Sequence, residues 1–327
     1  MCEKWLLGVD LGGTTTKLAF LDGNGQIIHK WEIPTDNSDE GKNITINIAK
    51  SLEEKISELG KSKENILGIG MGAPGPVDYE AGIIFNTANL DWRDNYPLRD
   101  LLQKETGLPV AIENDANCAA AGEMWKGAGN GSANVVCVTL GTGVGGGIVA
   151  NGQILQGFRG AGGEIGHITS VIEGGALCGC GKRGCLETVA SATGIVRIAM
   201  ERLEGNQITS GELYGLFQSN GKVSAKDVFD CANNEDEAAL AVVDTIAQYL
   251  GLALANIAST VNPEKFVLGG GVSQAGEVLL KPVLTYFNQY VFPPIKESTT
   301  ICLATLGNDA GVIGAAWLIQ NYLKSEI

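Results

Sequence analysis

Short apolar runs alternate along the chain with glycine-rich turns and with longer segments that carry apolar residues at helical spacing. Residues 4–30 predict a strand, a glycine turn and a second strand, because β-branched threonines and an Asp-Gly-Asn-Gly turn favour a hairpin. Residues 44–59 have helical periodicity, and residues 66–75 read as a buried strand. The pattern then predicts a helix over 98–106, a strand over 109–114 and a helix from residue 115 onward.

The second half of the chain starts in the same way. Residues 134–157 again predict a strand, a glycine turn, a strand and an Asn-Gly turn, and residues 150–155 are similar to residues 22–28. This similarity indicates a duplicated α/β unit, unless two glycine hairpins are alike by chance. Further predicted elements are helices at about 188–204, 235–260 and 310–324 and strands within 265–273 and 300–306. Alternating strands and helices favour an α/β architecture.

Length and charge narrow the possibilities. A chain of 327 residues with 44% hydrophobic residues fits a soluble protein of about two domains. The formal net charge of −14 argues against nucleic acid or an anionic membrane as the main partner. The apolar run at the N-terminus is short and leads into Asp10, so we expect no signal peptide and a cytoplasmic protein. Residues 238–261 are apolar but contain Asp244, Gln248 and Asn256, which favours a buried helix over a membrane span.

Three glycine-rich turns each follow a predicted strand. In residues 10–17, backbone amides, threonine hydroxyls and Lys17 could bind a polyanion, and Asp10 could hold a hydrated Mg²⁺. Residues 141–147 offer the same chemistry, and residues 268–273 could admit a flat base. None matches a P-loop or a dinucleotide fingerprint, and each alone could be a tight turn, but three together favour a nucleotide-binding cleft between two domains. The predicted nucleotide-binding residues are Asp10, Gly12, Gly13, Thr14, Thr15, Thr16, Lys17, Gly141, Thr142, Gly143, Gly269, Gly270 and Gly271.

A carboxylate lies where a strand gives way to a helix, near Asn114 and Asp115. Asp115 could simply cap the helix, which would by itself explain its residue type. A carboxylate at a helix N-terminus also feels the positive end of the helix dipole and stays ionised, so it could accept a proton from an attacking hydroxyl. The sequence leaves both interpretations open.

Three of the eight cysteines lie within eight positions, in Cys-Gly-Cys-Gly-Lys-Arg-Gly-Cys. Without an export signal we expect a reducing compartment, where metal binding is favoured over disulfides. His167 precedes Cys178 by eleven residues, and with Cys180 and Cys185 it completes a Cys₃His set that suits structural zinc. Free thiols are the alternative. The other five cysteines read as small hydrophobic residues: Cys2, Cys118, Cys137, Cys231 and Cys302.

Together these motifs resemble the ROK family (sugar kinases, repressors and related open reading frames), most closely its bacterial glucokinases. Residues 178–187 fit the family's Cys-x-Cys-Gly-x-x-Gly-Cys-x-Glu signature at every fixed position. The other family motifs occur in the same order, as VDLGGTTTK, ENDANCAAAGE, LGTGVGGGI, GGEIGH and LGGGVS. The resemblance implies an actin-like (ribonuclease H-like) ATPase fold of two α/β domains with a hinge and a cleft. It implies a smaller domain of residues 1–117 plus a C-terminal helix at about 310–327, and a larger one of residues 118–309 that carries the zinc loop.

The resemblance also implies roles for particular residues. Asp115 would be the catalytic base that takes the proton of a sugar hydroxyl as it attacks the γ-phosphoryl group of ATP. The sugar ligands would be Asn89, Asn114, Asp115, Glu164, His167, Glu187 and Gly75. ATP, Mg²⁺ and Zn²⁺ are the implied cofactors, and a homodimer is the implied assembly. Zn²⁺ on His167, Cys178, Cys180 and Cys185 would have no open position for a catalytic water, so it would shape the sugar site.

Three other functions fit parts of the sequence. The family's transcriptional repressors carry an N-terminal helix-turn-helix region, whereas here a strand is expected from about residue 4 and the net charge is acidic. A non-catalytic sugar-binding module would have no use for Asp10, Asp115 and two phosphate-binding turns. A kinase for another hexose, such as fructose, mannose or N-acetylmannosamine, remains the main alternative to a glucokinase.

Overall fold

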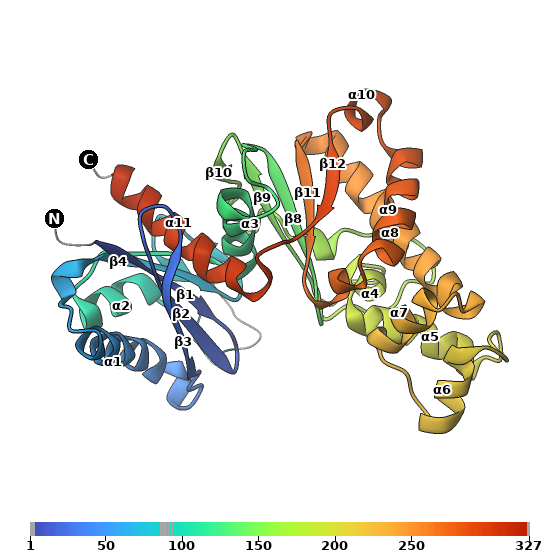
Figure 1. Cartoon of the computed structure of the whole chain (residues 1–327), viewed down its shortest axis with the longest axis horizontal. Coiled ribbons are helices and arrows are strands. Elements are labelled where there is room, and N and C mark those ends of the chain that lie inside the picture. Colours follow the sequence, from blue (N-terminus) through green and yellow to red (C-terminus); the bar gives the residue numbers. More distant parts are fainter. Residues whose placement is uncertain (1–3, 86–89, 91, 93, 326–327) are drawn as a thin grey trace. The chain divides into compact units, whose positions relative to one another are not determined.

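The structure, a computed structural model, describes residues 4–85, 90, 92 and 94–325. The chain divides into two compact units (Figure 1). Unit 1 comprises residues 1–131, 147–163 and 306–327, and unit 2 comprises residues 132–146 and 164–305. The boundary expected at residue 117 falls inside a helix of unit 1, and the segment 147–163 joins unit 1 because it packs on that same helix.

Unit 1 is built on a five-stranded sheet with the order β3-β2-β1-β4-β7. Its strands are β1 (Trp5–Leu11), β2 (Thr15–Leu21), β3 (Ile27–Pro34), β4 (Ile66–Ala73) and β7 (Val110–Asn114). The first three strands are antiparallel, as the predicted hairpin requires, whereas β4 and β7 run parallel to β1. A separate two-stranded hairpin consists of β5 (Val77–Asp78) and β6 (Ile83–Ile84).

Two hydrophobic cores cover the two faces of this sheet. On one face, α1 (Asn43–Glu58) and α2 (Leu98–Thr106) pack against alternate residues of β1 that include Leu7 and Val9. On the other face, α3 (Asp115–Lys126) and α11 (Ala310–Ser325) pack against Leu6 and its neighbours (Figure 1). The alternation along β1 follows from the two-residue period of a strand. The predicted helices at 44–59, 98–106 and 310–324 are confirmed.

Glycines let the elements of the second core approach closely. A Cβ atom at Gly70 of β4 would overlap the carbonyl oxygen of Ala315 in α11, and one at Gly314 would overlap the carbonyl oxygen of Cys118 in α3. The backbones of β4, α11 and α3 are therefore in direct contact. This close packing fixes where α3, and with it Asp115 at its first position, lies on the sheet.

We expect Gly70→Ala to destabilise the protein by about 1–3 kcal/mol, because the added methyl group has no space in this core. Gly215→Ala is the matched control, since Gly215 lies in helix α6 (Glu212–Asn220) and a Cβ there meets no atom within 4 Å. Alanine favours a helix over glycine, so Gly215→Ala should raise stability by up to about 1 kcal/mol. Urea denaturation of both variants measures the difference. Equal stability of the two would contradict the packing described here.

A second five-stranded sheet has the order β10-β9-β8-β11-β12. Its strands are β8 (Val135–Leu140), β9 (Val144–Ala150), β10 (Gln153–Ile154), β11 (Lys265–Gly269) and β12 (Thr300–Leu303). In both sheets a strand-turn-strand-turn-strand series is followed by two parallel strands on the other side. This shared order supports the duplicated α/β unit and argues against a chance similarity of two hairpins.

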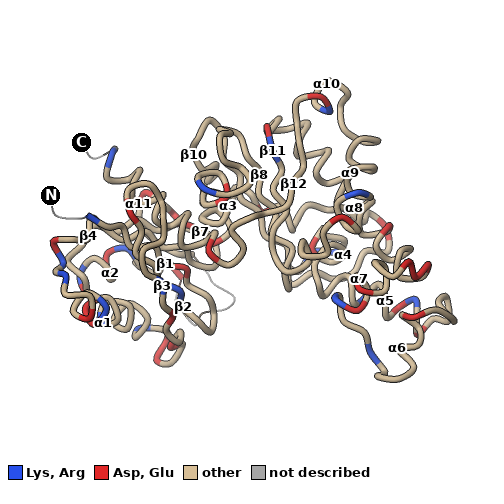
Figure 2. Tube along the Cα trace, in the orientation of Figure 1, with Lys and Arg blue, Asp and Glu red and all other residues tan. Residues whose placement is uncertain are grey.

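The helices of unit 2 are more numerous than the sequence pattern predicted. They are α4 (Glu187–Ala190), α5 (Ala192–Glu204), α6, α7 (Ala225–Asn233), α8 (Glu237–Val261), α9 (Glu277–Tyr290) and α10 (Pro293–Lys296). The predicted helix at 188–204 is two helices, because the hydroxyl of Ser191 caps the start of α5. Helix α8 is long and apolar enough to cross a membrane, but 56% of its most apolar window is buried in the protein. Figure 2 shows that basic and acidic residues occur on both units.

Candidate active site

The first glycine turn joins β1 to β2 in unit 1. Asp10 and Lys17 lie opposite each other across the two strands, with Nζ and Oδ2 3.7 Å apart. Burial raises the pKa of the Asp10 carboxyl above its usual value, and Lys17 opposes this shift. Thr14 is exposed at the tip of the turn, whereas Thr16 is buried and its hydroxyl lies 2.9 Å from that of Thr35. Thr16 therefore supports the turn from inside.

Two residues that the sequence did not single out hold this turn in place. The hydroxyl of Thr35 donates to the carbonyl oxygen of Gly12 at 2.8 Å, and the side-chain amide of Asn37 donates to that of Gly13 at 2.7 Å. Both follow β3, the edge strand of the sheet. With two of its carbonyl groups occupied, the turn is held rigidly, which suits a site that must bind an anion in a defined orientation.

Asn114, and not Asp115, is the N-cap of α3. The Asn114 side-chain oxygen accepts hydrogen bonds from the backbone amides of Ala116 and Asn117, at 2.9 and 3.2 Å. The side-chain amide of Asn114 donates a hydrogen bond to the carbonyl oxygen of Gly75 at 3.1 Å. This bond brings two predicted sugar ligands, Asn114 and Gly75, together beside Asp115. Asp115 is the first residue of the helix and is half-buried. Capping is thus served by its neighbour and does not explain why position 115 is an aspartate.

A buried carboxylate, Glu113, lies two residues before Asp115 in the chain. Glu113 has no exposed surface. Its carboxylate accepts hydrogen bonds from the backbone amide of Asn114, from Asn117 Nδ2 and from Gln156 Nε2, at 2.8, 3.1 and 2.7 Å. Burial raises the pKa of Glu113, and these three bonds oppose the shift. The network ties the start of α3 to the segment 147–163 of the same unit. No local sequence pattern indicates this pairing, because Glu113 and Gln156 are 43 residues apart.

The second glycine turn, in unit 2, joins β8 to β9 and contacts Glu187. Glu187 Oε2 accepts a hydrogen bond from the Val144 amide at 3.1 Å, and a Cβ at Gly143 would overlap that same oxygen. On its other side, the turn receives a hydrogen bond from the hydroxyl of Thr193 to the carbonyl oxygen of Thr142. The turn therefore lies directly against one predicted sugar ligand.

The four predicted zinc ligands come together in unit 2. The ligand atoms of His167, Cys178, Cys180 and Cys185 all lie within 4.8 Å of one another. The Sγ atoms of Cys180 and Cys185 are 3.6 Å apart, close to the separation of about 3.7 Å expected for two thiolates at about 2.3 Å from one tetrahedral ion. The set therefore fits Zn²⁺ in ligand type, number and spacing.

The two ring nitrogens of His167 face different partners. Nδ1 lies 3.6 Å from Cys178 Sγ, on the side of the cysteines, and Nε2 lies 3.9 Å from a carboxylate oxygen of Glu164. Cys178 also connects to Glu187, because its Sγ lies 3.4 Å from Glu187 Oε1. Burial raises the pKa of the Cys178 thiol to about 12, so without metal this thiol stays protonated and its S–H group donates a hydrogen bond to Glu187. Three predicted sugar ligands of unit 2 thus adjoin the cysteine cluster.

A cavity of about 700 Å³ in unit 2 combines the second and third glycine turns. Gly141 and Thr142 line it from one turn, and Gly271 from the other, whereas Gly270 packs against Leu140 beneath. The remaining lining residues come largely from α7 and the segment after β11: Ala192, Ala225, Lys226, Phe229, Asp230, Asn233, Val272, Gln274 and Ala275. The sequence did not predict α7, which supplies one wall. The cavity is large enough for a nucleotide.

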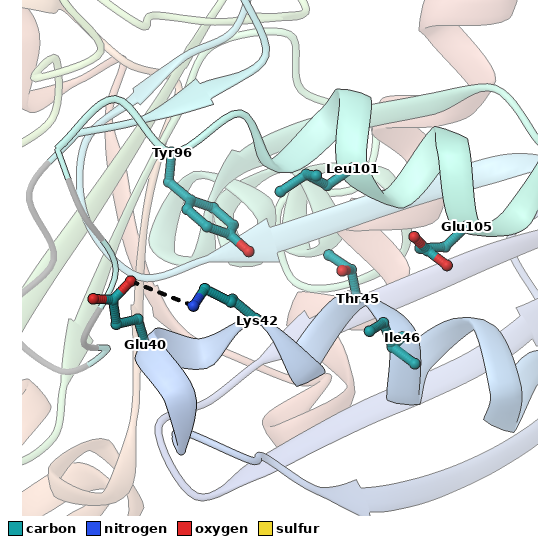
Figure 3. Close-up of a pocket in the computed structure, with 7 residues that line it drawn as sticks. All are labelled: Glu40, Lys42, Thr45, Ile46, Tyr96, Leu101 and Glu105. Carbon is teal, nitrogen blue, oxygen red and sulfur yellow. Dashed lines mark ion pairs between the residues drawn. The ribbon is translucent and has the colours of Figure 1, made fainter.

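Another cavity, of about 550 Å³, lies in unit 1 beside α1 and α2 (Figure 3). Its lining residues are Glu40, Lys42, Thr45, Ile46, Tyr96, Leu101 and Glu105. None of them is a predicted site residue, and we assign it no function. Asn89, a predicted sugar ligand, lies outside the described residues.

Comparison with known proteins identifies the family. A sequence profile of the ROK family matches residues 6–322. The chain belongs to the ROK family. Among ROK proteins, it is 55% identical to the glucokinase of Halalkalibacterium halodurans over 325 residues, which span 99% of this chain and 98% of that protein.

ROK kinases and ROK repressors both resemble the chain, at different levels. A ROK glucokinase from Streptomyces griseus, solved in complex with glucose and AMPPNP, shares 35% identity and a TM-score of 0.77, with 96% of this chain and 98% of that chain covered. The xylose repressor of Bacillus spizizenii is 28% identical, over 97% of this chain but only 77% of the repressor. The ROK relatives confirm the predicted actin-like fold with two α/β domains.

Proposed function

We propose that this ROK protein is a glucokinase, which phosphorylates glucose with ATP to give glucose 6-phosphate. The observation that carries this proposal is the 55% identity to a glucokinase over almost the whole length of both chains. The geometry supports it, because a half-buried carboxylate begins α3 and a nucleotide-sized cavity is lined by two glycine turns.

Asp115 acts as the general base in this proposal. It accepts the proton of the glucose 6-hydroxyl as that oxygen attacks the γ-phosphoryl group of ATP. Asn114 holds Asp115 in register by capping α3, and Glu113 holds the strand-to-helix junction from behind. The other hydroxyls of the sugar bind to Asn89, Gly75, Glu164, His167 and Glu187. These contacts orient the sugar and so determine which of its hydroxyls reaches Asp115.

The phosphate groups of ATP bind to the backbone amides of the turns at 10–17 and 141–143, and the adenosine binds in the cavity lined by α7 and Gly271. Asp10, together with phosphate oxygens of ATP, would hold Mg²⁺, which suits a cation that usually keeps one or two carboxylate ligands and several waters. When bound, Mg²⁺ neutralises the charge that develops on the phosphate oxygens. Lys17 adds a second positive charge beside Asp10.

His167, Cys178, Cys180 and Cys185 would hold Zn²⁺, and the metal would have a structural role, because four protein ligands leave no position for a reactive water. The residues around it do the binding: His167 presents Nε2 to a sugar hydroxyl, and Glu187 is oriented through its contacts with Val144 and Cys178. The protein acts in the cytoplasm as a homodimer, and its reaction supplies glycolysis.

A kinase for another hexose is the alternative. A coupled phosphorylation screen over a dozen hexoses, with ATP and with polyphosphate, tests the assignment, and NMR identifies the product. The highest kcat/KM should belong to glucose with ATP, with the phosphate on O6. A much higher kcat/KM for another hexose, or a phosphate on O1, would overturn the glucokinase assignment.

We expect Ala225→Trp to raise KM for ATP by about tenfold or more, because Ala225 lines the proposed adenosine cavity and an indole would fill part of it. KM for glucose should change little. Lys222→Trp is the control, since Lys222 is exposed just before α7 and does not line the cavity. Initial rates at varied ATP and glucose provide the measurement. An unchanged KM for ATP in Ala225→Trp would remove the nucleotide from this cavity.

A further inference from the structure

The chain passes between its two units at four places, after residues 131, 146, 163 and 305. Three of these crossings are attached to α3, the helix that begins with Asp115. Gly147 packs so closely on α3 that a Cβ there would overlap Ala116 and Ala120. The crossings after residues 131 and 305 are both attached through Glu123, near the other end of the same helix.

Glu123 is a buried carboxylate, with 1% of its surface exposed. Its Oε2 accepts a hydrogen bond from the Ala128 amide at 2.8 Å, and its Oε1 accepts one from the Leu306 amide at 2.9 Å. Gly127 must lack a Cβ, because a Cβ there would overlap Glu123 Oε2. One side chain thus holds the unit 1 end of two chain crossings that are far apart in sequence.

The unit 2 ends of the same two crossings are held as well. Glu264 Oε1 accepts hydrogen bonds from the Ala133 and Asn134 amides, both at 3.0 Å, and the Ala304 amide donates to the carbonyl oxygen of Leu268 at 2.8 Å. The boundary between the units falls at Gly131 and Ser132 in one crossing and directly after Thr305 in the other. Gly131 has a φ of +84°, and a Cβ there would meet no atom within 4 Å.

We propose that Glu123 is a positioning residue, which fixes the pivots at Gly131–Ser132 and Thr305 to the helix that carries the general base. Hinged enzymes usually close on their substrates by rotation at a few residues that connect two rigid parts of the chain. Both pivots are attached to α3 through the carboxylate of Glu123. Rotation at these pivots therefore moves unit 2 about points that are fixed relative to Asp115, on the same helix. This inference rests on the proposed glucokinase function.

Glu123→Gln tests the proposal with a change of one atom. A glutamine keeps the volume but has a single carbonyl oxygen, so it can accept from only one of the two amides, and its NH₂ group faces the other. We expect hydrogen exchange to accelerate at the Ala128 or Leu306 amide. We expect kcat/KM for glucose to fall by about two- to thirtyfold, while Kd for ADP stays within a factor of two.

Asp236→Asn is the matched control, because Asp236 also accepts from two backbone amides, of Glu212 and Ala239, but lies wholly inside unit 2. It should lower Tm without changing kcat/KM for glucose. If Glu123→Gln behaves in the same way, Glu123 is merely structural and the proposal is wrong. If Glu123→Gln does not fold, Gly131→Ala tests the same pivot, since its methyl group meets no neighbour but disfavours the positive φ. Unchanged kcat and KM in Gly131→Ala would then overturn the proposal.

The proposed function and the role of Glu123 can be contradicted separately. If the native protein does not phosphorylate glucose, the proposed function is wrong. Hydrogen exchange at Ala128 and Leu306, followed with and without ADP, still decides the role of Glu123, because it requires no turnover. Exchange equal to that of the native protein at both amides in Glu123→Gln would contradict the inference.

Discussion

Replacement of Asp115 by Asn is expected to lower kcat by about a hundredfold or more, the scale of a lost general base. The amide cannot accept the hydroxyl proton, so the attacking oxygen remains a poor nucleophile. Stability should change little, because Asn114 caps α3 and an asparagine at position 115 can still accept from the Ala116 amide. Binding of glucose should therefore persist. Steady-state kinetics, glucose titration and thermal denaturation of one preparation measure all three quantities.

Glu277→Gln is a suitable control for Asp115→Asn. Glu277 is likewise the first residue of a helix, α9, and it forms an exposed ion pair with Lys281 at 4.0 Å. Its replacement should leave kcat unchanged. If kcat of Asp115→Asn stays within a factor of a few of the native value, Asp115 is not the base.

Loss of the metal cluster should have the second large effect. We expect Cys180→Ser to lose Zn²⁺, to lower Tm and to weaken glucose binding by about tenfold or more, with much less effect on ATP binding. The selectivity follows from the contacts of Cys178 and His167, which adjoin Glu187 and Glu164, whereas the cavity proposed for the nucleotide is lined by other residues. Metal analysis combined with glucose and ATP titrations provides the measurement.

Cys302→Ser separates loss of the metal from loss of a thiol. Cys302 lies in β12, outside the cluster, and its Sγ is 3.5 Å from the carbonyl oxygen of Phe266. This variant should retain one zinc per chain and native glucose affinity. A native protein that contains no zinc and is fully active would contradict the structural role of the metal.

The strand-to-helix junction at Asp115 shows where sequence reasoning reaches its limit. Asn and Asp both cap helices well, so the pattern could not decide which of residues 114 and 115 is the cap. The structure decides it, because β7 pairs with β4 as far as Asn114, which faces Ala73 across the ladder. The helix therefore starts at Asp115. Pairing between strand residues that are 41 positions apart, such as Ala73 and Asn114, depends on the tertiary structure and leaves no local pattern in the sequence.

Helix α7 was missed for a different reason. Ser224 and Asp227 form a capping box, and Val228, Phe229, Cys231 and Ala232 are buried on one side of the helix. These signals are present in the sequence, but α7 is as short as its neighbour α6, and the longer helices α5 and α8 on either side of this pair dominated the pattern. This omission matters for function, because α7 lines the cavity that we propose binds the adenosine of ATP. By contrast, the cysteine cluster was predictable in full, because its ligands are close in sequence and metal chemistry restricts their types.

The contact of α11 with β4 and α3 has a consequence for biosynthesis. Half of the second core of unit 1, including Val312, Ala316 and Ile319, is translated last, although its partners Leu6 and Ala111 leave the ribosome early. At about 5–20 residues per second, the nascent sheet waits roughly ten seconds or more for that helix. During this interval the face of the sheet that α11 covers in the folded protein is exposed. We expect a nascent chain stalled before residue 310 to bind chaperones through this face, and release of the last helix to end that binding.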